Sequence, residues 1–238
     1  MSGMQDNILT VIPARAGSKG LLRKCLRTVG GVPLLQRTVS CALKSALAGR
    51  VIVSTDDPEF ALSAKEAGAE VPFLRPAELA TDTSSTIDVV LHLLSCLSET
   101  EDYRPSLVML LQPTSPFLMP LDIREAMDFL TPDADAVISV CNSEIKPDWL
   151  RTCSPDGWIT PFFDLSAKQH TPRQLMPDVL RINGALYLVR AKILLEEQTF
   201  IPQHTKPFLM PQQRSLDIDS ELDLKFANLI AGDIDRDL

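Results

Sequence analysis

The chain has 238 residues, of which 45% are hydrophobic, and it carries a formal net charge of −8. This length allows one or two domains, and the apolar content is ample for a buried core. The acidic balance argues against broad nucleic-acid binding, which usually needs a basic surface, and no apolar run approaches the ~20 residues of a membrane-spanning helix.

The first residues, MSGMQDNILT, lack the basic segment and long apolar core of a signal peptide, so we expect a cytoplasmic protein. The five cysteines form no CxxC pair, and neither structural disulfides nor a zinc site are expected. The three histidines are scattered along the chain and predict no catalytic triad.

Strand-like and helix-like segments alternate through the first half of the chain. Apolar or β-branched runs predict strands over 8–14, 50–55, 70–75, 106–113 and 135–140. Amphipathic or capped segments predict helices between them, over 33–46, 57–68, 83–97 and 120–130. This alternation predicts βαβ units, and hence an α/β fold with a doubly wound, mostly parallel sheet.

The alternation stops after Val140. Residues 141–178 are rich in proline and turn residues and contain both tryptophans. The apolar content of this segment is too high for a disordered linker. We expect an extension that packs on a partner subunit in a homodimer. A strand over 184–190 and helices over 191–198 and 220–232 follow. The prediction is a single domain over 1–238 with an inserted dimerisation extension at about 141–180.

A basic loop follows the first predicted strand. Its sequence, VIPARAGSKGLLRK over 11–24, matches neither the Walker A nor the GxGxxG pattern. Glycines let the backbone turn tightly and expose N–H groups, while a serine hydroxyl, an arginine fork and lysine ammonium groups suit phosphate oxygens. The position at a strand end of an α/β sheet therefore favours phosphate binding over a solvated basic turn. The residues concerned are Arg15, Gly17, Ser18, Lys19, Gly20 and Lys24.

Five sequence blocks together resemble the acylneuraminate cytidylyltransferases, the CMP-sialic acid synthetases. They are IPARAGSKG with Lys24, then residues 53–90, LLQPTSPF over 110–117, RINGALYLV over 181–189 and LDIDSELDL over 216–224. They occur in the family's order and span about Leu9 to Ile230. The resemblance implies a Rossmann-like nucleotidyltransferase that joins CMP from CTP to a nine-carbon keto-acid sugar and releases pyrophosphate.

The resemblance also implies roles for individual residues. Arg15, Ser18, Lys19 and Lys24 match the family's triphosphate contacts, with Gly17 in the same loop, and Lys24 is expected to neutralise charge on the α-phosphate. Arg75 matches a residue near the base and ribose. Catalysis would then be mainly positioning and charge stabilisation. Arg15, Lys24 and Asp219 are the expected catalytic residues.

The DID sequence at 217–219 places two carboxylates on one side of an extended chain. One interpretation is a Mg²⁺ site, because magnesium prefers one or two carboxylates plus phosphate oxygens. The other makes one aspartate a helix cap and leaves the second solvated, although Ser220 is itself a good cap. The resemblance, which includes a metal-binding DID, favours Mg²⁺ bound by Asp217 and Asp219.

The sugar side of the expected site is assembled from dispersed residues. Gln112 matches a sugar contact of the family, Asn183 and Tyr187 would form another wall, and Phe200 resembles an aromatic residue against the N-acyl group. Arg173 lies in the segment that, in the family, reaches into the partner's active site. For Tyr187 and Phe200, plain core packing is an equal alternative.

Four positions depart from the family pattern, and at one of them, Leu22, the chain loses a proline that stiffens the loop. Cys25 stands where an asparagine is usual, and a thiol is weak both as donor and as acceptor. Leu180 and Ile201 stand where aromatic residues occur, which suggests a sugar pocket of altered shape. The substrate is expected to be N-acetylneuraminate or a relative such as legionaminate or pseudaminate.

Two alternatives remain at this stage. The chain could be a weakened homologue that binds nucleotide as a regulator, an interpretation that rests on Cys25 alone. It could also be a ketodeoxyoctonate cytidylyltransferase, although the loop of that enzyme normally lacks the GSK run.

Overall fold

The computed structural model describes residues 7–17, 20–47, 49–162 and 179–234. Its centre is a six-stranded sheet of order β10-β6-β9-β5-β1-β4. The strands are β1 (Ile8–Pro13), β4 (Arg50–Ser54), β5 (Leu107–Leu111), β6 (Ala136–Asn142), β9 (Leu180–Arg190) and β10 (Thr205–Leu209). β1 runs parallel to β4 and β5, and β10 to β6, whereas β9 is antiparallel to both of its neighbours. The predicted α/β fold with a mostly parallel sheet is confirmed.

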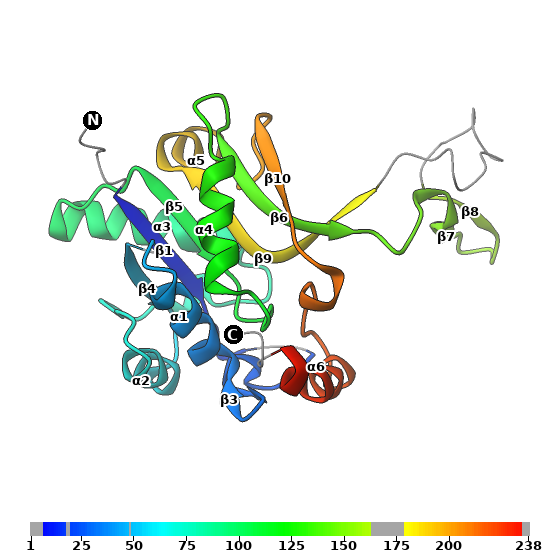
Figure 1. Cartoon of the computed structure of the whole chain (residues 1–238), viewed down its shortest axis with the longest axis horizontal. Helices are drawn as coiled ribbons and strands as arrows, with labels where there is room; N and C mark the ends of the chain where they lie inside the picture. The colour runs from blue at the N-terminus through cyan, green and yellow to red at the C-terminus, as the bar shows by residue number, and fades with distance from the viewer. Residues whose placement is uncertain (1–6, 18–19, 48, 163–178, 235–238) are drawn as a thin grey trace.

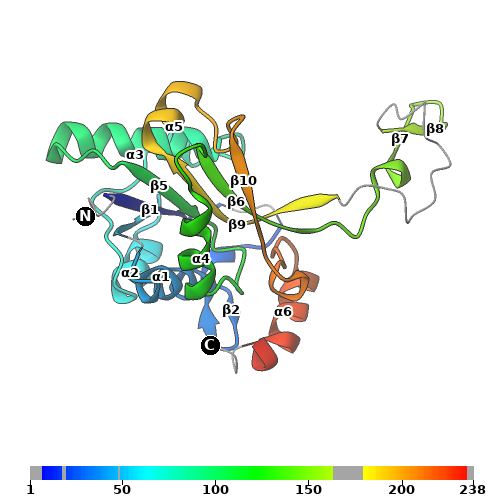
Figure 2. The same ribbon diagram turned by 45° about the horizontal axis from the view of Figure 1, so that its top comes forward.

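Helices cover both faces of this sheet (Figure 1; Figure 2). Helices α1 (Leu34–Lys44), α2 (Pro58–Glu66) and α4 (Pro120–Phe129) lie on one face, and α3 (Thr86–Glu101) and α5 (Ala191–Glu197) on the other. The alternation of β1 explains this, because Ile8 and Ile12 enter the first core while Leu9 and Val11 enter the second. The sheet is therefore doubly wound, as predicted.

A small third layer lies below the strand ends. Helix α6 (Glu221–Ile234) packs through Leu224, Ala227 and Ala231 against the hairpin of β2 (Thr28–Val29) and β3 (Val32–Pro33). Gly30 and Gly31 form its turn with φ of 59° and 78°, a combination that glycine adopts without steric cost. Sequence patterns did not reveal this hairpin, because each strand has only two residues.

The extension leaves the sheet where β6 and β9 run past the other strands (Figure 1; Figure 2). Beyond β6 come a 3₁₀ turn (Pro147–Trp149) and a hairpin of β7 (Arg151–Cys153) and β8 (Ile159–Pro161), which lies away from the helices that cover the sheet. Trp149, Trp158 and Ile159 are exposed there.

Two predicted features differ in the structure. The predicted strand 70–75 is only a single bridge between Ile52 and Glu70, because Pro72 offers no N–H to extend the pairing. Strand β9 begins at Leu180 rather than at residue 184, and β10 was not predicted. In contrast, the predicted cap of α2 is confirmed, since the Asp57 carboxylate accepts hydrogen bonds from the amides of Glu59 and Phe60.

Among the described residues, no helix is both long and apolar enough to cross a membrane.

Candidate active site

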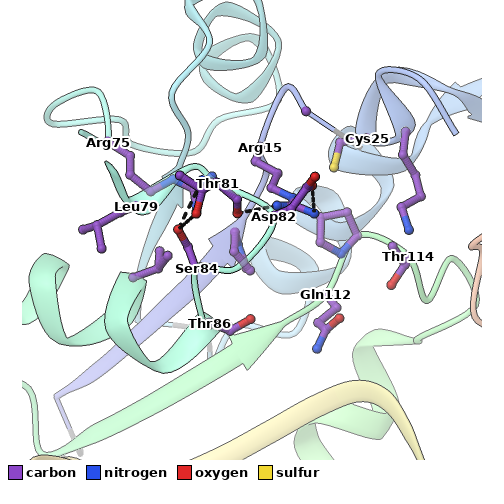
Figure 3. A pocket seen from close by; sticks show the side chains of 15 residues that line it. Arg15, Cys25, Arg75, Leu79, Thr81, Asp82, Ser84, Thr86, Gln112 and Thr114 are labelled. Carbon is purple, nitrogen blue, oxygen red and sulfur yellow. Dashed lines mark hydrogen bonds and ion pairs between the residues drawn. The ribbon is translucent and has the colours of Figure 1, made fainter. Parts of the chain in front are cut away.

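A pocket of about 250 Å³ opens at the carboxyl ends of β1 and β5 (Figure 3). Its lining comes from the loop after β1, from the connection between α2 and α3, and from the turn after β5. Ligands of doubly wound sheets bind at this edge, outside the carboxyl ends of the strands. Of the predicted site residues, it collects Arg15, Gly17, Lys24, Arg75 and Gln112.

Arg15 extends from the loop after β1 toward Thr81 and Asp82, which line the same pocket (Figure 3). Its guanidinium donates a hydrogen bond to the carbonyl of Thr81 and forms an ion pair of 3.1 Å with Asp82. The loop is anchored below it, where the Ala16 amide donates to Oδ1 of Asp56 at 3.1 Å. A phosphate bound here would compete with Asp82 for Arg15. Sequence reasoning assigned no role to Thr81 or Asp82, although the hydroxyl-rich run TDTSST was a signal.

Arg75 forms a buried wall of the pocket, with 6% of its surface exposed. Its Nη2 lies 3.6 Å from Oδ1 of Asp56, and both Nε and Nη2 are buried without a hydrogen-bond partner among the described residues. Burial lowers the pKa of Arg75, and the Asp56 carboxylate opposes this shift. Two unsatisfied donors beside a pocket fit a ligand that supplies acceptors.

Lys24 and Cys25 lie in a short 3₁₀ turn (Lys24–Leu26) that follows the basic loop. Nζ of Lys24 lies 2.8 Å from Oδ1 of Asp219, a residue 195 positions further along the chain. Cys25 is 7% exposed, and burial raises the pKa of its thiol to about 11 despite the nearby Lys24 and arginine charges. The thiol is therefore neutral near pH 7, which agrees with its having no nucleophilic role.

The segment with the two candidate metal ligands passes directly over the basic loop. A Cβ atom on Gly20 would lie 2.4 Å from the carbonyl oxygen of Asp219, so only glycine fits there. On the other side, the Ile218 amide donates to the carbonyl of Thr114, in the turn after β5, at 2.9 Å. The loop after β1, the turn after β5 and the start of α6 therefore meet at Asp217 and Asp219.

Neither aspartate is needed as a helix cap. Oδ2 of Asp223 accepts from the amide of Ser220 at 2.8 Å, and Oγ of Ser220 accepts from the amide of Asp223 at 3.3 Å. Asp219 is exposed, whereas Oδ1 of Asp217 is buried without a hydrogen-bond partner among the described residues. Burial is the main cause that raises the pKa of Asp217; a side-chain hydrogen bond with Thr114 opposes this shift, and the Asp219 charge adds to it.

The predicted sugar-side residues do not lie together in the structure. Gln112 lines the pocket, and Tyr187 packs against Phe200 with 5.8 Å between ring centroids on the α3 side of the sheet. Asn183 is buried, and its amide makes hydrogen bonds to Ser139 and Ser215. Arg173, Ser18 and Lys19 lie outside the described residues.

A family model described as cytidylyltransferase matches residues 9–220. The chain belongs to the cytidylyltransferase family. This cytidylyltransferase is 38% identical over 221 residues to the CMP-N,N'-diacetyllegionaminic acid synthase of Legionella pneumophila, covering 91% of this chain and 92% of that protein. It is 33% identical to the N-acylneuraminate cytidylyltransferase of Escherichia coli, covering 94% of this chain and 52% of that longer protein.

The fold of the cytidylyltransferase also agrees with solved structures. CMP:2-keto-3-deoxy-manno-octonic acid synthetase, complexed with CTP, superposes with a TM-score of 0.66 at 18% identity, covering 95% of this chain and 99% of the other. The chain is a nucleotidyltransferase of the acylneuraminate cytidylyltransferase type, and the family resemblance predicted from the five sequence blocks is confirmed.

Proposed function

We propose that this cytidylyltransferase transfers CMP from CTP to the anomeric hydroxyl of a nonulosonic acid and releases pyrophosphate. The observation that carries this proposal is the convergence of Arg15, Lys24, Asp217 and Asp219 at one edge of the sheet. Arginine and lysine suit a triphosphate, while paired carboxylates suit the metal ion that accompanies it.

The carboxylates fit Mg²⁺. Among the described residues, Oδ1 of Asp217 is a buried acceptor without a hydrogen-bond partner, and no cluster of three or more His, Cys, Asp or Glu side chains could hold a metal by itself. Mg²⁺ needs only one or two carboxylates when phosphate oxygens and water complete its shell. Asp217 and Asp219 would hold the ion, and when bound it would reduce the negative charge on the phosphates.

The side chains of the pocket account for the rest of the reaction. Arg15 would exchange Asp82 for phosphate oxygens, and Lys24 would exchange Asp219 for the α-phosphate, because both cations already point to this edge. The hydroxyl oxygen of the sugar would then form a bond to the α-phosphorus while its proton passes to water, and the bond from the α-phosphorus to the bridging oxygen would break, so that pyrophosphate leaves with the electron pair of that bond. Once these exchanges have occurred on binding, both cations are already in place to stabilise the charge that develops during the reaction. Gly17, Ser18 and Lys19 would complete the phosphate loop.

The sugar is proposed to be a legionaminate-type nonulosonic acid. The identity of 38% to the legionaminic acid synthase exceeds the 33% to the E. coli N-acylneuraminate enzyme and the 28% to a pseudaminic acid cytidylyltransferase of Campylobacter jejuni. Gln112, Tyr187 and Phe200 would face the sugar, and Arg173 would reach it from the partner subunit of a homodimer.

The test is pyrophosphate release with CTP and Mg²⁺. Parallel reactions contain N,N'-diacetyllegionaminate, N-acetylneuraminate, pseudaminate, ketodeoxyoctonate or no sugar, each with an EDTA control. We expect release with the legionaminate sugar, at a kcat/KM at least tenfold above the others, and none in EDTA. Release with ketodeoxyoctonate alone would reassign the substrate. A protein that binds CTP but turns over no sugar would instead be a nucleotide-binding regulator.

A further inference from the structure

The segment that carries Asp217 and Asp219 is attached to the sheet at an irregularity of β9. The β6–β9 register pairs Ile138 with Tyr187 and then Val140 with Ile182, so residues 183–186 of β9 lie opposite Ser139 alone. Gly184 adopts a φ of 80° within this bulge. The bulge frees the side chain of Asn183 from the regular strand alternation and lets it reach Met210 and Ser215 in the segment after β10.

Both polar atoms of the Asn183 side-chain amide make hydrogen bonds within the protein. Its Oδ1 accepts from Oγ of Ser139 at 2.6 Å and from the Ala185 amide at 3.2 Å. Its Nδ2 donates to Oγ of Ser215 at 2.9 Å and to the sulfur of Met210 at 3.3 Å. All four hydrogen-bonding positions are occupied, and 2% of the residue is exposed. The amide is therefore committed to a buried network.

Ser215, which accepts the hydrogen bond from Asn183, lies two residues before Asp217. Its Oγ donates to the carbonyl of Pro211 at 2.9 Å, and its own carbonyl accepts from Nη2 of Arg181 at 3.0 Å. Ser215 is itself 2% exposed. Both its side chain and its backbone are consequently held by β9.

The residue before Ser215, Arg214, is held by α4 rather than by β9. Arg214 forms a two-bond ion pair with Asp122, whose carboxylate also accepts from the Met119 amide at the start of α4. Both side chains are largely buried. Beyond the two aspartates, the Ser220–Asp223 cap begins α6. Residues 216–219, which carry the two carboxylates, are therefore fixed at both ends. Arg214 and Ser215 hold the chain before them, and the helix cap holds it after them.

We infer that Asn183, Ser139 and Ser215 form a positioning network that aims the Asp217 and Asp219 carboxylates, and that Asn183 is a positioning residue rather than a sugar ligand. This inference rests on the proposed metal site. Groups that orient metal ligands commonly change metal affinity or activity by about 10- to 100-fold when they are removed. The same network also joins the carboxylates to β9, the strand through which the chain returns from the extension.

The test measures Mn²⁺ affinity by electron paramagnetic resonance, with CTP present and sugar absent, so that no turnover occurs. We expect Ser215→Ala to weaken Mn²⁺ binding by about tenfold, while CTP binding in EDTA changes less than twofold. Ser63→Ala is the matched control, because it removes another buried hydroxyl, in α2, whose described hydrogen bond goes to Gln36. Its Mn²⁺ affinity should equal that of the unaltered protein.

Arg181→Gln provides a second variant. The direction in which it changes Mn²⁺ affinity distinguishes a charge effect from a positioning effect. Arg181 is a surface cation whose charge acts on the Asp217 carboxylate, so removing that charge alone would strengthen cation binding. Loss of the bond to the Ser215 carbonyl predicts the opposite, a weakening of at least threefold. Unchanged or tighter binding in both variants, with Asp219→Ala still abolishing it, would overturn the positioning role alone. Mn²⁺ binding that survives Asp219→Ala would overturn the metal site and this inference with it.

Discussion

Among single residues, Asp219 is the one whose removal should abolish metal binding while leaving the fold intact. It is 75% exposed, and its described side-chain contact is with Lys24, so Asp219→Ala should unfold at nearly the same temperature as the unaltered protein. We expect kcat with Mg²⁺ to fall by about 100-fold or more, since even groups behind a metal ligand change activity by about 10- to 100-fold. Asp128→Ala, another exposed aspartate, is the control. Normal turnover by Asp219→Ala would remove Asp219 from the metal site.

The thiol of Cys25 gives a prediction about pH. Its pKa of about 11 means that the reactive thiolate is scarce at pH 8 and increases only as the pH rises towards 11. Iodoacetamide at pH 8 should therefore modify the exposed Cys153 first and leave Cys25 intact, as peptide mass spectrometry would reveal. CTP-protected modification of Cys25 at pH 8, with loss of activity, would contradict the buried, neutral thiol.

At the scale of elements, the site depends on how closely the basic loop approaches the start of α6. Gly20→Ala would place a methyl group against the backbone of Asp219, and one of the two segments must then move. We expect kcat/KM to fall by about tenfold or more, because displacements near 1 Å in an active site have effects of this size. Gly232→Ala in α6, where a Cβ meets nothing within 4 Å, should keep full activity. Equal activity of both variants would show that the loop adapts freely.

Elements that sequence patterns missed share a physical cause. Strand β10 contains Pro207, which argues against a central strand, but β10 pairs only with β6 at the edge of the sheet, where proline is tolerated. Pro72 has the opposite effect in the predicted strand 70–75. Proline disfavours a strand at both positions. Whether a strand forms there depends on where the segment lies in the sheet.

At the scale of the whole molecule, the extension predicts a dimer. Trp158 is 75% exposed and Ile159 72% exposed on a hairpin that lies away from the body, and large exposed apolar groups that gather in this way mark contact surfaces. Sedimentation at micromolar concentration should give twice the mass of one chain. The double variant Trp158→Ser, Ile159→Ser should shift it to the monomer, whereas Leu62→Ser, at an exposed leucine of α2, should not. A monomer for the unaltered chain would contradict the prediction.

The sequence alone determined the alternating α/β architecture, the basic loop after the first strand and the aspartate pair at 217–219. These features depend on local patterns of apolar, basic and acidic residues, which a single chain displays directly. The helix cap of α2 was equally local, because Asp57 and Pro58 are neighbours.

Contacts between distant groups depend on how the elements pack together. Lys24 contacts Asp219 because β1 and β5 are adjacent in the sheet and because the chain returns beneath them after β10. Asn183 was expected to face a sugar, yet a bulge in β9 directs its amide to Ser139 and Ser215. Strand order and bulges arise from packing between residues far apart in sequence, and no local pattern encodes them.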